Sequence, residues 1–213
     1  MTEIEKTLMW CQAAQLRAVR DWHDNEPTSG PDPSPDKMEQ GAEPFVLFQD
    51  LVLAQHLVNF QLWHVEDRAR RRDVGPEVIA QCKQEIDALN QRRNDMIERM
   101  DDSLIQLMSP LLPESEAGYN TETLGSVLDR LSILALKIYH MREQAERQDA
   151  PQEQIEECAA KLTVMQEQHR DLVESMLGLV REYGSGLKRP KVYRQYKMYN
   201  DPRLNPELYG GKA

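Results

Sequence analysis

Several apolar stripes in this chain are interrupted by polar side chains of the kinds that bind ligands or transfer protons. In one stripe, Asn59 takes an apolar position one turn before Trp63. His56 and Asp67 flank this stripe, and His64 lies three residues before Asp67, one turn away on the same side of the helix. Imidazole and carboxylate groups at this spacing can ligate a metal ion or act as acid and base.

Two further stripes have the same character. Asn90 and Arg93 interrupt the second, and Asn94 lies one turn beyond Asn90. Asp129 and His140 lie along one face of a third segment that is otherwise largely apolar. A buried polar group without a partner costs about 1–3 kcal/mol, so these residues should satisfy one another, a ligand or a metal ion. Two interpretations stay open: a ligand site, or a polar layer that only sets the register of the helices.

The composition indicates which elements must position these residues. Aromatic residues make up only 6% of the 213 residues, and runs of β-branched residues are scarce, so the chain is predicted to be all-α. Helix start and stop signals predict helices from Thr2 to about Trp22, Pro44 to about Arg72, Pro76 to about Met108, Thr121 to the turn at Asp149, and Pro151 to Tyr183, with a loop over residues 24–43.

Short connections between long helices force antiparallel neighbours. The predicted fold is therefore a long up-down antiparallel helical bundle of four long helices plus an N-terminal helix, over residues 1–186. In two antiparallel helices, residues at equal distances from the connecting turn lie opposite each other. This comparison places Asn59 opposite Asn90, and Asp129 opposite Arg170 as an expected ion pair. A coiled-coil dimer is the competing arrangement, so a homo-oligomer is possible.

Net charge and hydropathy argue against nucleic-acid-binding, membrane-spanning and secreted proteins. The formal net charge of −10 argues against nucleic-acid binding by the body of the protein. The longest apolar run, residues 131–139, is too short to span a bilayer, and the first residues lack the pattern of a secretory signal. A cytoplasmic location is expected.

In contrast to the net negative charge of the whole chain, residues 187–213 form a basic tail with interleaved tyrosines. The tail has three interpretations: it docks on carboxylates of the bundle, it binds phosphate groups through residues such as Arg194 and Lys197, or it contacts a partner. Docking is favoured, because tyrosines at three-residue spacing can face one surface of a short helix.

A divalent metal ion is a possible cofactor. The first candidate set of ligands is His64, Asp67 and His140. Asp95, Glu98 and Asp101 form a second set, whose spacing is the one that holds Mg²⁺ in some all-α pyrophosphohydrolases. Ladders of this second kind are usually solvated helix surface, so the identity of any metal stays open.

Four separated segments, in order, carry a family resemblance. They are NFQLWHVEDRAR (59–70), IDALNQRRNDMIERMD (86–101), NTETLGSVLDRLSILALKIYHM (120–141) and KVYRQYKMYNDPRLNP (191–206). In these segments the chain resembles a bacterial family known as domain of unknown function 4254. The resemblance implies an all-helical bacterial protein without an established activity, whose relatives are encoded near glycosyltransferase and cell-envelope genes.

The leading hypothesis is that the polar layer binds a small phosphorylated ligand, such as a nucleotide or nucleotide-sugar, and that a metal assists hydrolysis or group transfer. The candidate catalytic residues are His64, Asp67 and His140. The candidate ligand-binding residues are His56, Asn59, Trp63, Asn90, Arg93, Asn94, Asp129, Arg194 and Lys197. The alternative is a non-enzymatic interaction or scaffold protein, with a link to cell-envelope glycan synthesis, in which the buried polar layer only sets the register of the helices.

Overall fold

The computed structural model describes residues 1–31, 41, 43–114, 116–196, 198 and 201–209. Its elements are α1 (Glu3–Asp24), α3 (Pro44–Ala69), α4 (Pro76–Met108), the 3-10 turn η1 (Ser109–Leu111), α5 (Leu124–Ala145), α6 (Gln152–Gly184) and the short α7 (Pro206–Tyr209). These described elements are all helical, which confirms the predicted all-α class.

Local chemistry explains where these helices begin. The Thr2 side chain accepts a hydrogen bond from the Glu5 backbone N–H, and Glu5 returns one to the Thr2 N–H, which is a complete capping box for α1. Pro44 and Pro76 occupy the first position of α3 and α4, where the N–H that proline lacks has no intrahelical partner anyway. The fourth predicted helix starts later than expected, because Thr123 caps α5 by accepting from the Ser126 N–H.

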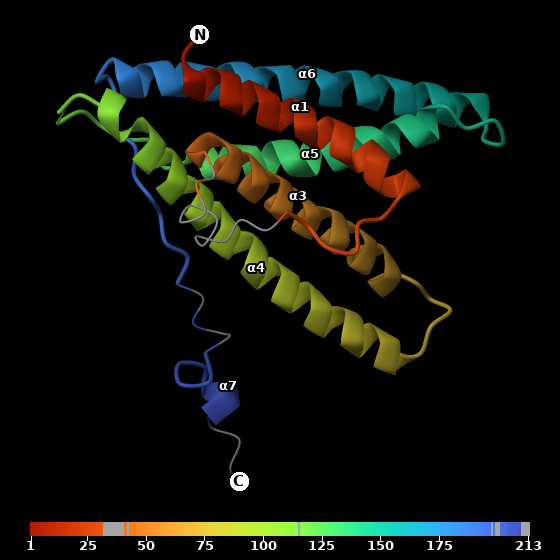
Figure 1. Ribbon diagram of the computed structural model, residues 1–213. Coiled ribbons are helices and arrows are strands. Elements are labelled where there is room, and N and C mark those ends of the chain that lie inside the picture. Colours follow the sequence, from red (N-terminus) through yellow and green to blue (C-terminus); the bar gives the residue numbers. More distant parts are fainter. Residues whose placement is uncertain (32–40, 42, 115, 197, 199–200, 210–213) are drawn as a thin grey trace.

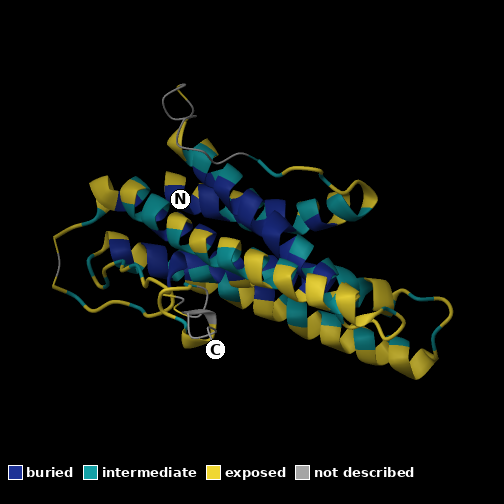
Figure 2. Cartoon of the chain, turned by 90° about the horizontal axis from the view of Figure 1, so that it is seen from below, coloured by how far each residue is buried: buried dark blue, intermediate teal, exposed yellow. Residues whose placement is uncertain are grey.

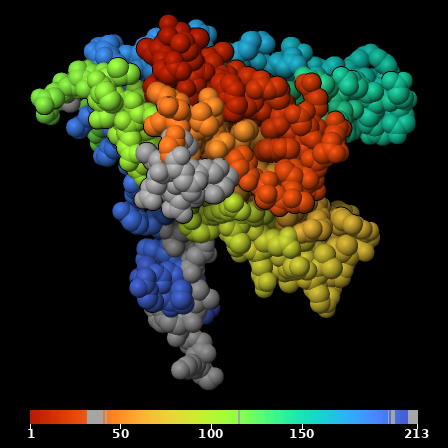
Figure 3. Space-filling view, viewed as in Figure 1, coloured from red at the N-terminus to blue at the C-terminus, as the bar shows by residue number. Residues whose placement is uncertain are grey.

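The long helices form two antiparallel hairpins, α3 with α4 and α5 with α6, and α1 packs on α3, α5 and α6. The hairpins meet where α4 ends and α5 begins, and they diverge toward their far ends (Figure 1). In the space-filling view, red-orange residues at the end of α1 lie between the gold end of the α3–α4 hairpin and the teal end of the α5–α6 hairpin (Figure 3). The predicted single up-down bundle is therefore not confirmed, although its antiparallel neighbours are present.

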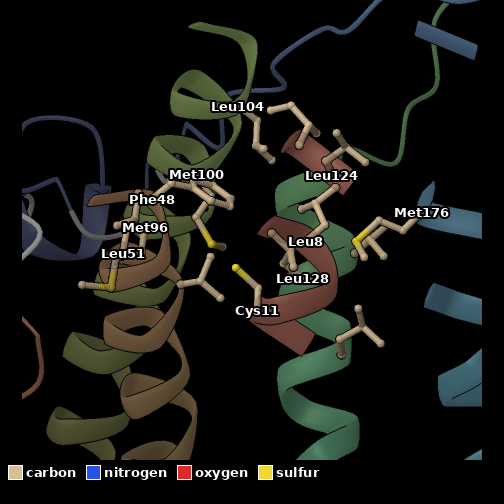
Figure 4. Close-up of a cluster of buried hydrophobic side chains, with 14 of the residues drawn as sticks. Leu8, Cys11, Phe48, Leu51, Met96, Met100, Leu104, Leu124, Leu128 and Met176 are labelled. Carbon is tan, nitrogen blue, oxygen red and sulfur yellow. The ribbon is translucent and has the colours of Figure 1, made fainter. Parts of the chain in front are cut away.

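The hydrophobic core lies at the end where the hairpins meet. Leu8, Phe48, Met100, Leu104 and Leu128 are essentially inaccessible to solvent and pack together from four helices (Figure 4). Buried residues concentrate there and along α3 and α5, whereas large parts of α4 and α6 are exposed (Figure 2). The two hairpins are therefore held together at this packed end and separate with increasing distance from it.

Gly125 allows α4 and α5 to approach closely at this end. Its backbone N–H donates to Asp101 Oδ1 at 2.7 Å. A Cβ at Gly125 would lie 2.7 Å from the carbonyl oxygen of Ile97 and 2.8 Å from Asp101 Oδ1. Such distances are below van der Waals contact, so a side chain there would push the two helices apart.

The first part of the basic tail contacts α4. Arg194 donates to Glu98 Oε2 at 3.2 Å and to Asp102 Oδ1 at 2.9 Å, and the Gln195 N–H donates to Glu98 Oε1 at 2.7 Å. Exposed ion pairs of this kind contribute only about 0–1 kcal/mol, so docking of the whole tail stays a prediction. No helix in the described part of the chain has the length and apolar character needed to cross a bilayer.

Candidate functional site

Asp129 is the centre of a buried hydrogen-bond network between the two hairpins. Its Oδ1 accepts from Gln55 Nε2 at 2.6 Å and from Asn59 Nδ2 at 3.0 Å, both on α3. From α4, Arg93 donates Nε to Oδ1 at 2.8 Å and Nη2 to Oδ2. The side chain of Asp129 is only 7% exposed, so these donors replace the water that its charge would otherwise require.

A second polar layer continues the network toward α1. Asn59 Nδ2 also donates to Ser132 Oγ at 2.8 Å, and Ser132 Oγ lies 2.6 Å from His56 Nδ1. His56 is fully buried, and this burial lowers the pKa of its imidazole to about 3. His56 is therefore neutral at physiological pH and serves as an uncharged hydrogen-bond partner.

The predicted pairing of Asp129 with Arg170 is wrong. Arg170 is exposed on α6, and Arg93 is the cation that binds Asp129. The face of α5 that carries Asp129 packs against α3 and α4, because the donors to its carboxylate all come from those two helices. The distance of a residue from the turn predicts its position along the helix axis, but it does not predict which side of the helix the residue faces.

An open groove lies beside this network, between α3, α4 and α5. It has a volume of about 370 Å³ and is lined by Asn59, Leu62, Trp63, Glu66, Asp67, Arg70, Asn90, Arg93, Ile133 and Leu136. Two carboxylates and two guanidinium groups line it, so its formal charges balance. Arg70 reaches Glu66 at 3.0 Å and Asp67 at 3.9 Å in ion pairs that are largely exposed.

The groove brings together some of the residues predicted from the sequence. Those that line it are Asn59, Trp63, Asp67, Asn90 and Arg93. His56 and Asp129 lie beneath it in the buried network. Glu66 and Arg70 line it as well and were not among the predicted site residues, although they continue the same polar stripe one and two turns beyond Trp63.

Other predicted residues lie elsewhere. Asn94 is half-buried on α4 and is outside the lining of the groove. Arg194 binds Glu98 and Asp102 on α4. Lys197 lies outside the described residues. The arrangement therefore does not place Arg194 at the groove.

His64 and His140 belong to a cluster of aromatic rings away from the groove lining. Their ring centroids are 6.2 Å apart, and both pack against His23 at the end of α1. His140 also stacks on Trp63, with ring centroids 4.7 Å apart and an interplanar angle of 11°. The sequence predictions missed His23, because it precedes a loop and no periodic pattern relates it to the other two histidines.

The second candidate set of metal ligands, Asp95, Glu98 and Asp101 on α4, does not come together around one point. Asp95 accepts from Gln91 Nε2, Glu98 accepts from the tail, and Asp101 points into the core to accept from Gly125. More generally, the described residues include no group of three or more His, Cys, Asp or Glu side chains already placed to hold a metal ion.

Comparison with known proteins identifies one similarity. The family model described as "Protein of unknown function (DUF4254)" matches residues 49–192, which include α4, α5, α6 and most of α3. The network, the groove and two of the three clustered histidines fall inside this match, while His23 precedes it. No curated protein and no solved structure matches the chain.

Proposed function

We propose that this chain, which belongs to the DUF4254 family of proteins of unknown function, binds a small phosphorylated ligand in the groove between its two helix hairpins. A nucleotide or a nucleotide-sugar is the class that we favour. The observation that carries the proposal is a groove with both polar and aromatic lining, directly above a buried network that holds its residues in place.

The size and lining of the groove support this class of ligand. Pockets for small molecules typically have volumes of about 300–1,000 Å³, and the groove has about 370 Å³. Trp63 lines it with an indole ring that is backed on one face by His140, so its orientation is fixed. Such a ring can pack against a base or a sugar. Asn59 uses its Nδ2 donors within the network, so its amide can offer a ligand only the oxygen as an acceptor.

The charged residues offer two ways to hold phosphate. Arg93 uses Nε and Nη2 for Asp129, so within the described part of the chain Nη1 can donate to a ligand oxygen. The ion pairs of Arg70 with Glu66 and Asp67 are largely exposed, so they cost little to break. Glu66 and Asp67 can bind a magnesium ion that bridges to a diphosphate, because Mg²⁺ commonly binds through one or two carboxylates plus substrate phosphates. Metal-assisted hydrolysis or transfer is the reaction class that this arrangement would support.

Titration of the protein with uridine and adenosine diphosphates and their sugar conjugates, with and without Mg²⁺, tests the proposal. Calorimetry should detect one binding site, and thermal unfolding should shift upward with ligand concentration. The variant Arg70→Gln should bind at least several-fold more weakly, whereas Arg71→Gln, whose partner is Asp73 outside the groove, should bind normally. Absence of binding to the unmodified protein, or equal loss in both variants, would contradict the proposal.

The alternative is an interaction or scaffold function, and one observation favours it. The Asp129 carboxylate is satisfied by donors of the protein itself, as expected of a network that only sets helix register. This alternative predicts that the double variant Asn59→Leu with Asn90→Leu stays folded and keeps its partner. Folded protein with lost function would rule it out. A cytoplasmic location and a homo-oligomeric state stay predictions from the sequence.

A further inference from the structure

A second groove runs along α1, on residues that the proposed ligand site does not use. From the helix it is lined by Trp10, Ala14, Arg17, Ala18, Asp21 and Trp22. The rest of the lining comes from Pro27, Ser29, Gly30 and Pro31, which follow α1, and from Leu53 of α3. This α1 groove has a volume of about 300 Å³.

The sequence of α1 explains the shape of this groove. Ala14 and Ala18 lie one turn apart, and each presents only a methyl group where a longer side chain would fill the space. Trp10 and Trp22 stand about 18 Å apart along the helix axis, because an α-helix rises about 1.5 Å per residue. The α1 groove is therefore elongated, with small residues between two tryptophans.

Part of the lining is held in place by its own packing. The Trp22 ring packs against His56, with ring centroids 5.0 Å apart. Gly30 lies so close to α3 that a Cβ there would be 3.0 Å from Leu57 Cδ2. Trp10, in contrast, is 38% exposed. Because tryptophan is enriched at the centres of binding surfaces, an indole left open beside a fixed concave lining indicates a partner.

Two charged side chains of the lining are available to such a partner. Arg17 and Asp21 lie one turn apart and are both exposed. Neither side chain forms an ion pair or a hydrogen bond with another residue in the part of the chain that the structure describes. The α1 groove thus offers an apolar surface with one cation and one carboxylate beside it.

These features fit a proline-rich peptide in the polyproline II conformation. Such peptides dock into apolar grooves lined by aromatic rings. Two turns of polyproline II contain six residues and extend about 19 Å, which matches the separation of Trp10 and Trp22. The carbonyl groups of this helix make no internal hydrogen bonds, so Arg17 can donate to one of them. Asp21 can pair with a basic residue beside the prolines.

We propose that the α1 groove binds a proline-rich segment of a partner protein, with a basic residue next to the prolines. Prolyl rings would pack on Trp10 and over the small residues Ala14 and Ala18. The α1 groove and the groove between the hairpins share no lining residue. The interaction therefore does not depend on the proposed binding of a phosphorylated ligand.

Fluorescence anisotropy with a labelled peptide of six prolines followed by two arginines is the direct test. We expect saturable binding to the full-length protein, and none for a glycine–serine peptide of the same length with the same two arginines. Replacing the arginines by glutamine should weaken binding several-fold. This difference should disappear in Asp21→Asn and persist in Asp24→Asn, because Asp24 lies outside the lining.

Variants of the apolar lining then locate the site. Trp10→Ala should weaken binding of the proline peptide about tenfold or more. Tyr196→Ala is the matched control, because Tyr196 is an aromatic residue that is 87% exposed and lies outside the α1 groove. Ala18→Gln keeps both tryptophans but fills the space between them, so it should weaken binding as well, and glutamine suits a helix. Circular dichroism confirms that each variant is folded.

The unmodified protein decides the outcome even if a variant unfolds. Absence of saturable binding of the proline peptide, or equal binding of the glycine–serine peptide, would overturn the proposal. Tighter binding of an amphipathic helical peptide with the same two arginines would also overturn it, since the α1 groove would then accept a helix. Equal losses in Trp10→Ala and Tyr196→Ala would show that the peptide binds elsewhere.

Discussion

Arg93 and Asp129 form a two-point ion pair that joins α4 to α5, with Nε donating to Oδ1 at 2.8 Å and Nη2 to Oδ2. The Asp129 side chain is buried, while the Arg93 side chain is 26% exposed and lines the groove. Asp129 therefore has a structural role inside the network, while Arg93 stays accessible from the groove. The same contact that connects the two hairpins also orients a cation toward any ligand in the groove.

Removing either partner of this pair should destabilise the protein. Arg93→Met leaves a buried carboxylate without its cation, and we expect the free energy of unfolding to fall by about 2–3 kcal/mol. Asp129→Leu should cost a similar amount, and the double variant should cost clearly less than the sum, because no unpaired charge remains. Urea denaturation of the four proteins gives the coupling energy. Additive single effects would show that the pair contributes nothing beyond packing.

Gly125 should not tolerate a side chain. Because a Cβ would lie 2.7 Å from the Ile97 carbonyl oxygen, Gly125→Ala should lower the free energy of unfolding by about 1–3 kcal/mol. Gly178→Ala in α6 is the matched control, since no atom outside the local backbone of α6 lies within 4 Å of its Cβ position. There alanine should stabilise the protein by about 0.5–1 kcal/mol through helix propensity. Equal effects at both positions in thermal denaturation would contradict the close α4–α5 contact.

Asp101 should make stability decrease as pH rises in mildly acidic solution. Burial raises the pKa of Asp101 to about 6 in the folded protein, against a normal value of 3.8. The folded state therefore holds a proton that the unfolded state has lost between pH 4 and 6, and stability should fall by on the order of 2 kcal/mol over that range.

Asp101→Asn should remove this contribution, since asparagine keeps an acceptor for the Gly125 N–H but has no titratable group. Asp102→Asn is the control, because Asp102 lies at the surface beside Arg194. Urea midpoints measured from pH 4 to 7 would disagree with the prediction if Asp101→Asn kept the slope of the unmodified protein.

His56 should act in the opposite direction. Because burial lowers its pKa to about 3 in the folded protein, the unfolded chain gains a proton first as pH falls below about 6.5. The contribution of His56 to stability is therefore complete above pH 6.5 and is lost progressively toward pH 3. Proton chemical shifts of the imidazole should show no titration above pH 4, and a midpoint near 6.5 would mean that the ring is hydrated.

Most of the secondary structure follows from the sequence. The prolines at 44 and 76 and the box formed by Thr2 and Glu5 determine where three helices begin, because caps act within one turn of the chain. The polar interruptions at Asn59, Arg93 and Asp129 were likewise visible as breaks in apolar stripes, and all three belong to the network. Local periodicity was enough to find them.

The pairing of distant residues depends on the three-dimensional packing of the helices. The sequence predicted Arg170 as the partner of Asp129, whereas the packing of α5 against α3 and α4 pairs Asp129 with Arg93. His64 follows Trp63 on α3 but does not line the groove, and it packs instead against His23 from a different helix. Crossing angles and helix rotations are set by how side chains from several helices fill the core together, and no single segment of sequence contains that information.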